Sequence, residues 1–305
     1  MTPEAGDRVG GQTEPREFTA PREFVVALDG SRGSLAALHA AALLAHALDA
    51  DLVGVFVQEE ALTRYAGLPH AREVRPWTGT LAVLDSGRLQ TDLAALEALA
   101  RRALAHEALA AGVAGRFVLV KGRAADEVLA AGRSATLVAA GRVAGRPGRP
   151  ARLGSTAVQL VRGGCPTVVI VEPGRRLHGP VFVLCDESPS SARALDLALR
   201  FGRAHGIMVT TLLASRGPMP LAARLAGNEH TAYRLRPGSD PLEALPSSGG
   251  FLVLPGESPA IDEKQIGRLV SDLGFAVILV RAEPQPPDVR AEPQPPDQPT
   301  AEDST

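Results

Sequence analysis

Several features that often decide function are scarce in this chain of 305 residues. It has two cysteines, Cys165 and Cys185, and no Cys/His spacing typical of a metal site. Aromatic residues make up 4% of the sequence, so packing must depend on aliphatic side chains. The formal net charge of −2 gives no basic field for nucleic acid or an anionic membrane. The cysteine count excludes a disulfide framework and favours a reducing, cytoplasmic location.

Long hydrophobic runs are also missing. The longest apolar stretch, residues 35–57, is interrupted by His39, His46, Asp49 and Asp51. A membrane-spanning helix needs about 20 predominantly apolar residues. Residues 1–20 mix acids, bases, glycine and proline and have no apolar core typical of a secretory leader. We therefore expect no membrane segment and no leader.

What the sequence does contain is one pattern used twice. Residues 24–31 read FVVALDGS, and residues 181–188 read VFVLCDES. In each copy an aspartate, Asp29 or Asp186, follows an apolar run, and an Ala/Leu-rich helical segment comes directly after. In an open parallel sheet, ligands bind beyond the carboxyl ends of the strands. The repeat predicts two related units, and the aspartate marks a candidate contact for a polar ligand.

Hydrophobic periodicity predicts alternating strands and helices in the first unit. The expected strands are residues 24–28, 52–57, 117–120, 136–140 and 167–171, and the expected helices are residues 35–48, 88–111, 125–131 and 156–162. A polar insertion, residues 58–87, contains Tyr65 and the single tryptophan, Trp77. Short strand-to-helix connections favour right-handed crossovers. This order is typical of an open, doubly wound α/β sheet.

The second unit repeats that order with shorter loops. Its expected strands are residues 181–184, 208–213, 233–235, 251–254 and 276–280, and its expected helices are residues 191–205 and 262–272. Gly and Pro at both ends of residues 173–180 predict a hinge. We therefore expect a tail (1–21), a first α/β domain (22–173), a second α/β domain (174–281) and a second tail (282–305). Both tails are expected to be disordered, the latter because of its Pro and acid content.

A loop rich in glycine and arginine follows the fourth strand of the first unit. Backbone amides in such loops and at helix N-termini bind phosphate, and arginines can screen a polyphosphate. The candidate phosphate contacts are Gly141, Arg142, Ala144, Gly145, Gly154, Ser155 and Thr156.

Together these motifs resemble the universal stress protein family. Members carry an aspartate at the end of the first strand and, after the fourth, the pattern Gly-x2-Gly-x9-Gly-Ser/Thr. Residues 29–31 (Asp-Gly-Ser) match the first motif, and Gly141 with residues 154–155 gives the full span of the second. Ala144 stands where the middle glycine is expected. The resemblance covers residues 22–172, and the second unit is a weaker copy.

The resemblance implies two tandem flavodoxin-like (Rossmann-like) five-stranded sheets of strand order 3-2-1-4-5, packed as a pseudo-dimer through their last strands. In one branch of the family it also implies ATP or AMP binding, with Mg²⁺ if the ligand is ATP. Asp29 would accept a hydrogen bond from ribose or base, and loop amides would donate to phosphate. Ala144 keeps its amide donor if its φ is negative, whereas a positive φ costs about 1 kcal/mol. The expected contacts are Asp29, Gly30, Ser31, Gly141, Arg142, Ala144, Gly145, Gly154, Ser155 and Thr156.

The second unit is expected to bind no nucleotide. Alignment of the last strands places Glu263 and Lys264 where the first unit has its Gly-Ser, and a carboxylate there repels phosphate. Glu187 also replaces the glycine after the strand-end aspartate. One site per chain follows.

Simpler interpretations stay open. Asp-Gly-Ser after a strand is as typical of a turn with a helix cap, which is a purely structural role, as it is of a ligand contact. The motifs of P-loop NTPases, dehydrogenases and α/β-hydrolases are missing, and no nucleophile has a partner, so we expect no enzyme, although slow ATP hydrolysis stays open.

Two functions remain. One is a nucleotide-binding regulator or sensor of the stress response, and the other is a ligand-free interaction protein that uses residues 65–77 of the insertion and the closing strands. Protein partners and further homodimerisation also stay open.

Overall fold

The computed structural model describes residues 22–74, 78–141, 153–174, 179–214, 230–236, 249–258 and 274–282, together with residues 243, 245, 246, 266 and 269. Trp77, the expected disordered tails other than Ala282, and most of the expected helix 262–272 lie outside these residues.

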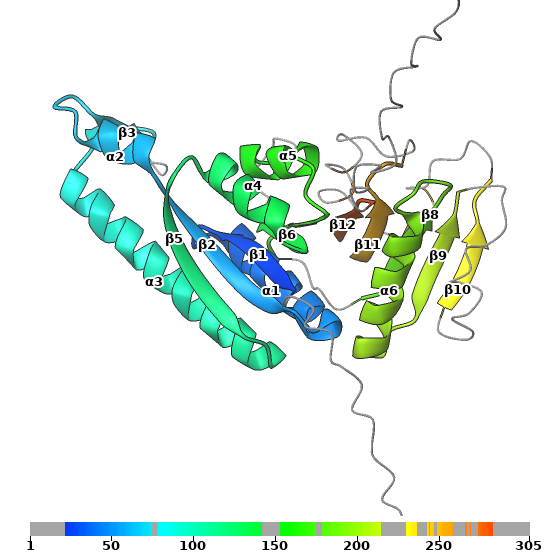
Figure 1. Ribbon diagram of the computed structural model, residues 1–305. Coiled ribbons are helices and arrows are strands. Elements are labelled where there is room, and N and C mark those ends of the chain that lie inside the picture. The colour runs from blue at the N-terminus through cyan, green and yellow to red at the C-terminus, as the bar shows by residue number, and fades with distance from the viewer. Residues whose placement is uncertain are drawn as a thin grey trace, which may run out of the picture.

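Twelve strands and six helices are defined within the described residues (Figure 1). The first half of the chain forms β1 (Glu23–Leu28), α1 (Arg32–Leu48), β2 (Asp51–Glu59), α2 (Glu60–Ala66), β3 (Arg72–Val74), β4 (Leu81–Val83), α3 (Ser86–Ala111), β5 (Gly115–Gly122), α4 (Ala124–Ser134), β6 (Leu137–Gly141), α5 (Ser155–Arg162) and β7 (Thr167–Val171). The second half forms β8 (Val181–Cys185), α6 (Ser191–His205), β9 (Val209–Leu213), β10 (His230–Arg234), β11 (Gly250–Pro255) and β12 (Phe275–Val280).

The main sheet is continuous through both halves. Its ten strands have the order β10-β9-β8-β11-β12-β7-β6-β1-β2-β5, so each half has its strands in the order 3-2-1-4-5. Strands are parallel within a half, and β7 pairs with β12 in the antiparallel direction, with Val169 opposite Ile278. This pairing of the last strands was expected. The two buried strands satisfy each other's outer N–H and C=O groups, so the two five-stranded sheets form one continuous sheet.

The register makes positions in the two halves directly comparable. Phe24 of β1 pairs with Leu52 and Leu137, and Val181 of β8 pairs in the same way with Val209 and Phe251. The strand-end aspartates Asp29 and Asp186 are therefore equivalent. By the same register, Gly141 pairs with Val171 and Pro255 pairs with Val280, so Pro255 takes the place of Gly141.

Helices cover both faces of the sheet. Buried residues of α1, α3 and α6 pack in one hydrophobic core, and those of α4 and α5 pack in the other. The two halves also touch through helices, since His205 Nε2 of α6 lies 3.0 Å from the Leu43 carbonyl of α1 and donates to it. Small side chains such as Ala41 and Ala198 are fully buried, as the low aromatic content predicts.

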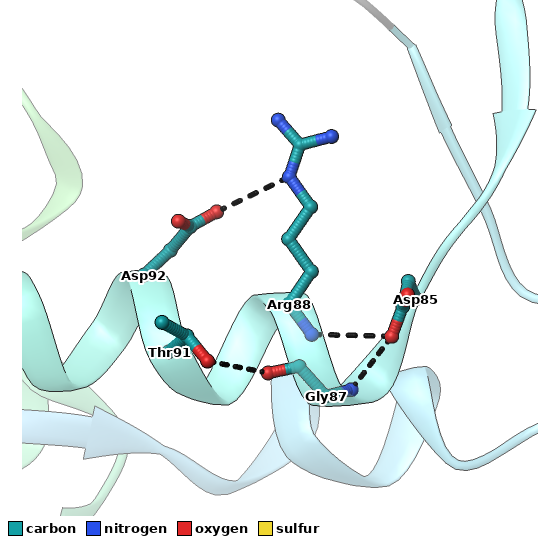
Figure 2. A network of polar contacts seen from close by, with 5 residues as sticks. All are labelled: Asp85, Gly87, Arg88, Thr91 and Asp92. Atoms are coloured by element: carbon teal, nitrogen blue, oxygen red, sulfur yellow. Dashed lines mark hydrogen bonds and ion pairs between the residues drawn. The ribbon is translucent and has the colours of Figure 1, made fainter.

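Helix α3 begins two residues before its expected start because of its cap. Asp85 accepts hydrogen bonds from the backbone N–H groups of Gly87 (2.9 Å) and Arg88 (3.1 Å), as Figure 2 shows. Thr91 donates to the Gly87 carbonyl, and Arg88 lies 3.8 Å from Asp92. A capping aspartate satisfies first-turn donors that the helix itself leaves free, which fixes where the helix starts.

Within the insertion 58–87, the described residues form α2 and the antiparallel pair β3–β4. The Tyr65 hydroxyl donates to the Arg72 carbonyl and accepts from the Arg72 amide, both at 3.1 Å. This contact ties α2 to the hairpin. Among the described residues, no helix combines the length and the apolarity needed to cross a membrane.

Candidate functional site

A cavity of about 620 Å³ opens at the carboxyl ends of β1, β2 and β6. Helices α1, α4 and α5 surround it, and it falls in the range of small-molecule sites. Its position beyond the strand ends is where open α/β sheets bind ligands. Six of the expected contact residues line it: Asp29, Ser31, Gly141, Gly154, Ser155 and Thr156.

Asp29 starts the turn that leads from β1 into α1. Its carboxylate Oδ1 accepts a hydrogen bond from the Ser31 amide at 2.9 Å, and its own amide donates to Ser34 Oγ at 3.3 Å. Ser31 in turn caps α1, because its Oγ accepts from the Ser34 amide at 3.2 Å. Gly30 makes this turn at φ +74°. The expected turn and cap are therefore present, and the exposed carboxylate of Asp29 also borders the cavity.

The floor of the cavity is a close contact between two glycines. A Cβ added to Gly141 would lie 2.0 Å from the carbonyl carbon of Gly33 and 2.6 Å from the Ser34 nitrogen. No side chain fits there, so the end of β6 and the first turn of α1 approach through bare backbone. This contact brings the Asp29 turn and the end of β6 to the same edge of the sheet.

The start of α5 forms a polar wall of the same cavity. Gly154 is its N-cap, in extended conformation and without a side-chain hydrogen bond to the first turn. Ser155, Thr156 and Ala157 follow and line the cavity. First-turn amides have no partner within their own helix, and the helix dipole adds positive partial charge there. The wall is therefore suited to an anion such as phosphate.

The apolar wall of the cavity was not predicted. It consists of Ala27, Val55, Val57, Ala124 and Val128. Val55 and Val57 come from β2, which lies beside β1, and Ala124 and Val128 come from α4. The apolar run at residues 52–57 was recognised as a strand, but the run alone does not show which of its side chains face a ligand. Two residues after β7, Pro173 and Gly174, also border the cavity.

The other four expected contacts are one described residue, Gly30, and three residues that the structure does not describe. Gly30 shapes the turn but is not among the residues that line the cavity. Arg142, Ala144 and Gly145 lie outside the described residues. Within the described part of the chain, no cluster of three or more His, Cys, Asp or Glu side chains is arranged to hold a metal ion.

The equivalent strand end in the second half is built differently. Asp186 Oδ1 accepts from both the amide and the hydroxyl of Ser188, while its Oδ2 is buried without a hydrogen-bond partner. Ser190, which replaces Gly33, is also buried, and its hydroxyl has no partner. Burial raises the pKa of the neighbouring Cys185 thiol to about 12, so this thiol stays protonated. Glu263 and Lys264 lie outside the described residues.

Comparison with known proteins agrees with this architecture. Residues 21–171 match the sequence model of the Universal stress protein family. A universal stress protein from Archaeoglobus fulgidus is 15% identical, with 87% of this chain and 100% of that chain aligned and a TM-score of 0.57. A family protein from Burkholderia pseudomallei is 28% identical over 49% of this chain and 95% of that chain, with a TM-score of 0.31.

A further universal stress protein, solved in complex with cAMP, is 24% identical over 51% of this chain and 100% of that chain, with a TM-score of 0.33. The search among curated proteins gave no match. The aspartate turn, the glycine contact and the sheet order define a flavodoxin-like α/β protein. Through residues 21–171, the chain belongs to the universal stress protein family.

Proposed function

We propose that the first half binds one adenine nucleotide, ATP or AMP, and acts as a regulator or sensor in the stress response. One observation carries this proposal: a single cavity combines an acidic turn, an apolar wall and a helix start whose first-turn amides have no side-chain cap. These three surfaces match the three parts of a nucleotide, namely a polar ribose, a flat apolar base and an anionic phosphate.

Each surface has a defined role in this proposal. The base lies against Val55, Val57 and Val128, which remove it from water. Asp29 accepts a hydrogen bond from a ribose hydroxyl or a base amine. The amides at the start of α5 donate to phosphate oxygens, and Ser155 adds a hydroxyl. With ATP, Mg²⁺ would be held mainly by phosphate oxygens and water, as is usual for this ion.

We propose binding without turnover, in the cytoplasm. No described residue at the cavity pairs a nucleophile with a base, because its lining is Ser, Thr, Gly, aliphatic side chains, Asp29 and Arg32. A hydrolytic water would need a positioned base beside the phosphates. Asp29, the acidic residue of the described lining, is assigned to the ribose or base instead.

A calorimetric titration with Mg-ATP and with AMP tests the proposal. We expect saturable heat and a matching rise in melting temperature. Gly154→Glu places a carboxylate beside the α5 amides and should weaken ATP binding roughly 100-fold, about 3 kcal/mol. Gln90→Glu adds the same charge on an exposed turn of α3 and serves as control. No heat and no thermal shift at millimolar ligand would contradict nucleotide binding, and an unchanged affinity in Gly154→Glu would place the site elsewhere.

A second candidate function rests on the insertion. One face of the β3–β4 hairpin exposes Val74, Leu81 and Val83, with 62%, 64% and 72% of their surfaces accessible. A two-stranded hairpin with an open apolar face is marginal in water and is typical of a protein contact. Replacing Val74 and Val83 by Ser leaves the cavity intact. If this double variant binds ATP as wild type does but no longer supports the stress response in cells, the interaction role is favoured.

A further inference from the structure

The second half reaches into the first at Arg281, the residue directly after β12. Its guanidinium donates to the Cys165 carbonyl at 2.9 Å and, through the other terminal nitrogen, to the Val161 carbonyl. Its backbone amide donates to the Pro166 carbonyl at 2.8 Å. One arginine therefore holds three carbonyl groups of a segment that lies more than 110 residues earlier in the chain.

Those carbonyls belong to the end of α5 and the turn that follows it. Val161 is in the last turn of the helix, where carbonyl groups lack partners within the helix and carry negative partial charge. A cation placed there stabilises the helix end. Arg133 of α4 adds a hydrogen bond from Nε to the Gly163 carbonyl at 3.3 Å. The end of α5 is thus held by one arginine from each half.

Helix α5 depends on such restraints because it is short. It has 8 residues, too few for a stable isolated helix, and spans about 12 Å. Its other end carries Ser155 and Thr156 at the cavity. A shift at the Arg281 end would therefore move the amides at the cavity, because a short helix moves as a rigid unit.

Arg281 is itself fixed by the second half. Its carbonyl accepts from Arg193 of α6 at 3.0 Å, and its side chain packs so close to Gly256 that a Cβ there would lie 2.7 Å from Arg281 Cγ. The residue directly after β7, at the corresponding position in the first half, is Glu172, whose carboxylate cannot donate to carbonyl groups. The side chain of Glu172 therefore cannot bind helix-end carbonyls of the second half as Arg281 binds those of the first.

We infer that Arg281 is a positioning residue for the phosphate part of the nucleotide site, so that the second half sets the phosphate affinity of the first. The inference rests on the proposed function. The second half then has a role although its own strand end lacks the glycine contact. It holds α5, and with it the phosphate-binding amides, in place.

The experiment compares Arg281→Met with wild type in the full-length chain, using Mg-ATP and adenosine as ligands and amide hydrogen exchange of residues 155–162 without ligand. We expect ATP affinity to fall about tenfold, adenosine affinity to stay within roughly twofold, and exchange in α5 to rise about tenfold. Adenosine lacks the phosphates that α5 binds, so this difference separates positioning from general loss of stability.

Two further variants complete the test. Arg281→Lys keeps the charge with fewer fixed donors and should recover part of the ATP affinity. Arg200→Met is the control, because Arg200 also crosses between the halves, donating to the Leu48 carbonyl at 3.4 Å, but does not touch α5. Equal losses for ATP and adenosine, an equal ATP loss in Arg200→Met, or unchanged exchange in α5 would overturn the inference. Absence of ATP binding in wild type would overturn the proposed function. The exchange data, which need no ligand, would still show whether Arg281 holds α5 in place.

Discussion

The two strand-end aspartates show how one local structure can serve two different environments. Asp29 and Asp186 make the same pair of turn contacts, each accepting from a serine amide at 2.9 Å and donating its own amide to a serine hydroxyl. Among the described residues, the cavity lies beside Asp29. The turn is therefore common to both halves, and what differs is the neighbouring backbone.

The difference lies in two register positions. In the first half, Gly33 and Gly141 let α1 and β6 meet through bare backbone. In the second half the same positions hold Ser190 and Pro255, whose side chains prevent that approach. This comparison shows that a binding site depends on pairs of residues from different elements, so an intact single motif is not sufficient.

Breaking the glycine contact should have the largest effect. In Gly141→Ala the new Cβ would overlap the Gly33 carbonyl, so we expect the free energy of unfolding to fall by about 3 kcal/mol and ATP binding to be lost. Urea unfolding with calorimetric titration measures both. Pro255→Ala, its counterpart, should cost less than about 1 kcal/mol and leave ATP binding intact. Equal effects of the two variants would show that the halves do not differ at this contact.

The next largest effect concerns the turn after the strand-end aspartate. The first half has Gly30 in this turn, and the second half has Glu187 at the equivalent position. Gly30→Ala forces a side chain into φ +74° and places its Cβ 2.9 Å from Leu96 Cδ2. We expect a loss of about 2 kcal/mol in the free energy of unfolding. Gly112→Ala, at φ +69° with open space around it, should lose about 1 kcal/mol. If the two variants are equally stable, contact with Leu96 contributes nothing.

The helix caps give a smaller but cleaner contrast. Ser31→Ala removes the hydroxyl that accepts from the Ser34 amide and should cost about 1 kcal/mol of unfolding free energy. Ser190 is the N-cap of α6, but its buried hydroxyl makes no hydrogen bond, so Ser190→Ala should be neutral or stabilising. Chemical unfolding of both variants measures these changes in the free energy of unfolding. A loss in Ser190→Ala as large as in Ser31→Ala would contradict the difference between the caps.

The smallest effect near neutral pH concerns Cys185 of the second half, which is equivalent to Leu28 of the first half. Burial raises the pKa of this thiol from its usual 9.0 to about 12. Between these values the folded state keeps a proton that the unfolded state releases, so the free energy of unfolding should fall as pH rises from about 9 to about 12. The contribution of the Cys185 thiol to the free energy of unfolding should be fully present below about pH 9. Cys185→Ala should show a shallower alkaline decline, and an unchanged slope would mean that Cys185 is not the group responsible.

Much of the fold could be predicted because each element carries its own local pattern. The strand expected at residues 24–28 is β1, and the helix expected at 35–48 is α1, which begins at Arg32 because Ser31 caps it. Strand β10 begins three residues before its expected start. Its polar sequence, HTAYR, gives no apolar run from which to place that boundary.

The candidate site was predicted only in part. Asp29 and Ser155 are marked by motifs, and both line the cavity. Val55 of the apolar wall was missed because an apolar strand is expected to be buried along its whole length, so its sequence does not show which side chains border a cavity. The carbonyls bound by Arg281 are 116 and 120 residues away in the chain, so no local pattern points to them.

The number of ATP molecules bound per chain shows whether the first half alone holds the nucleotide. Calorimetric titration of the full-length protein with Mg-ATP should give one site, which Gly154→Glu weakens roughly 100-fold and Pro255→Ala leaves unchanged. Two sites per chain, or one site whose affinity Gly154→Glu does not change, would contradict binding of the nucleotide by the first half alone.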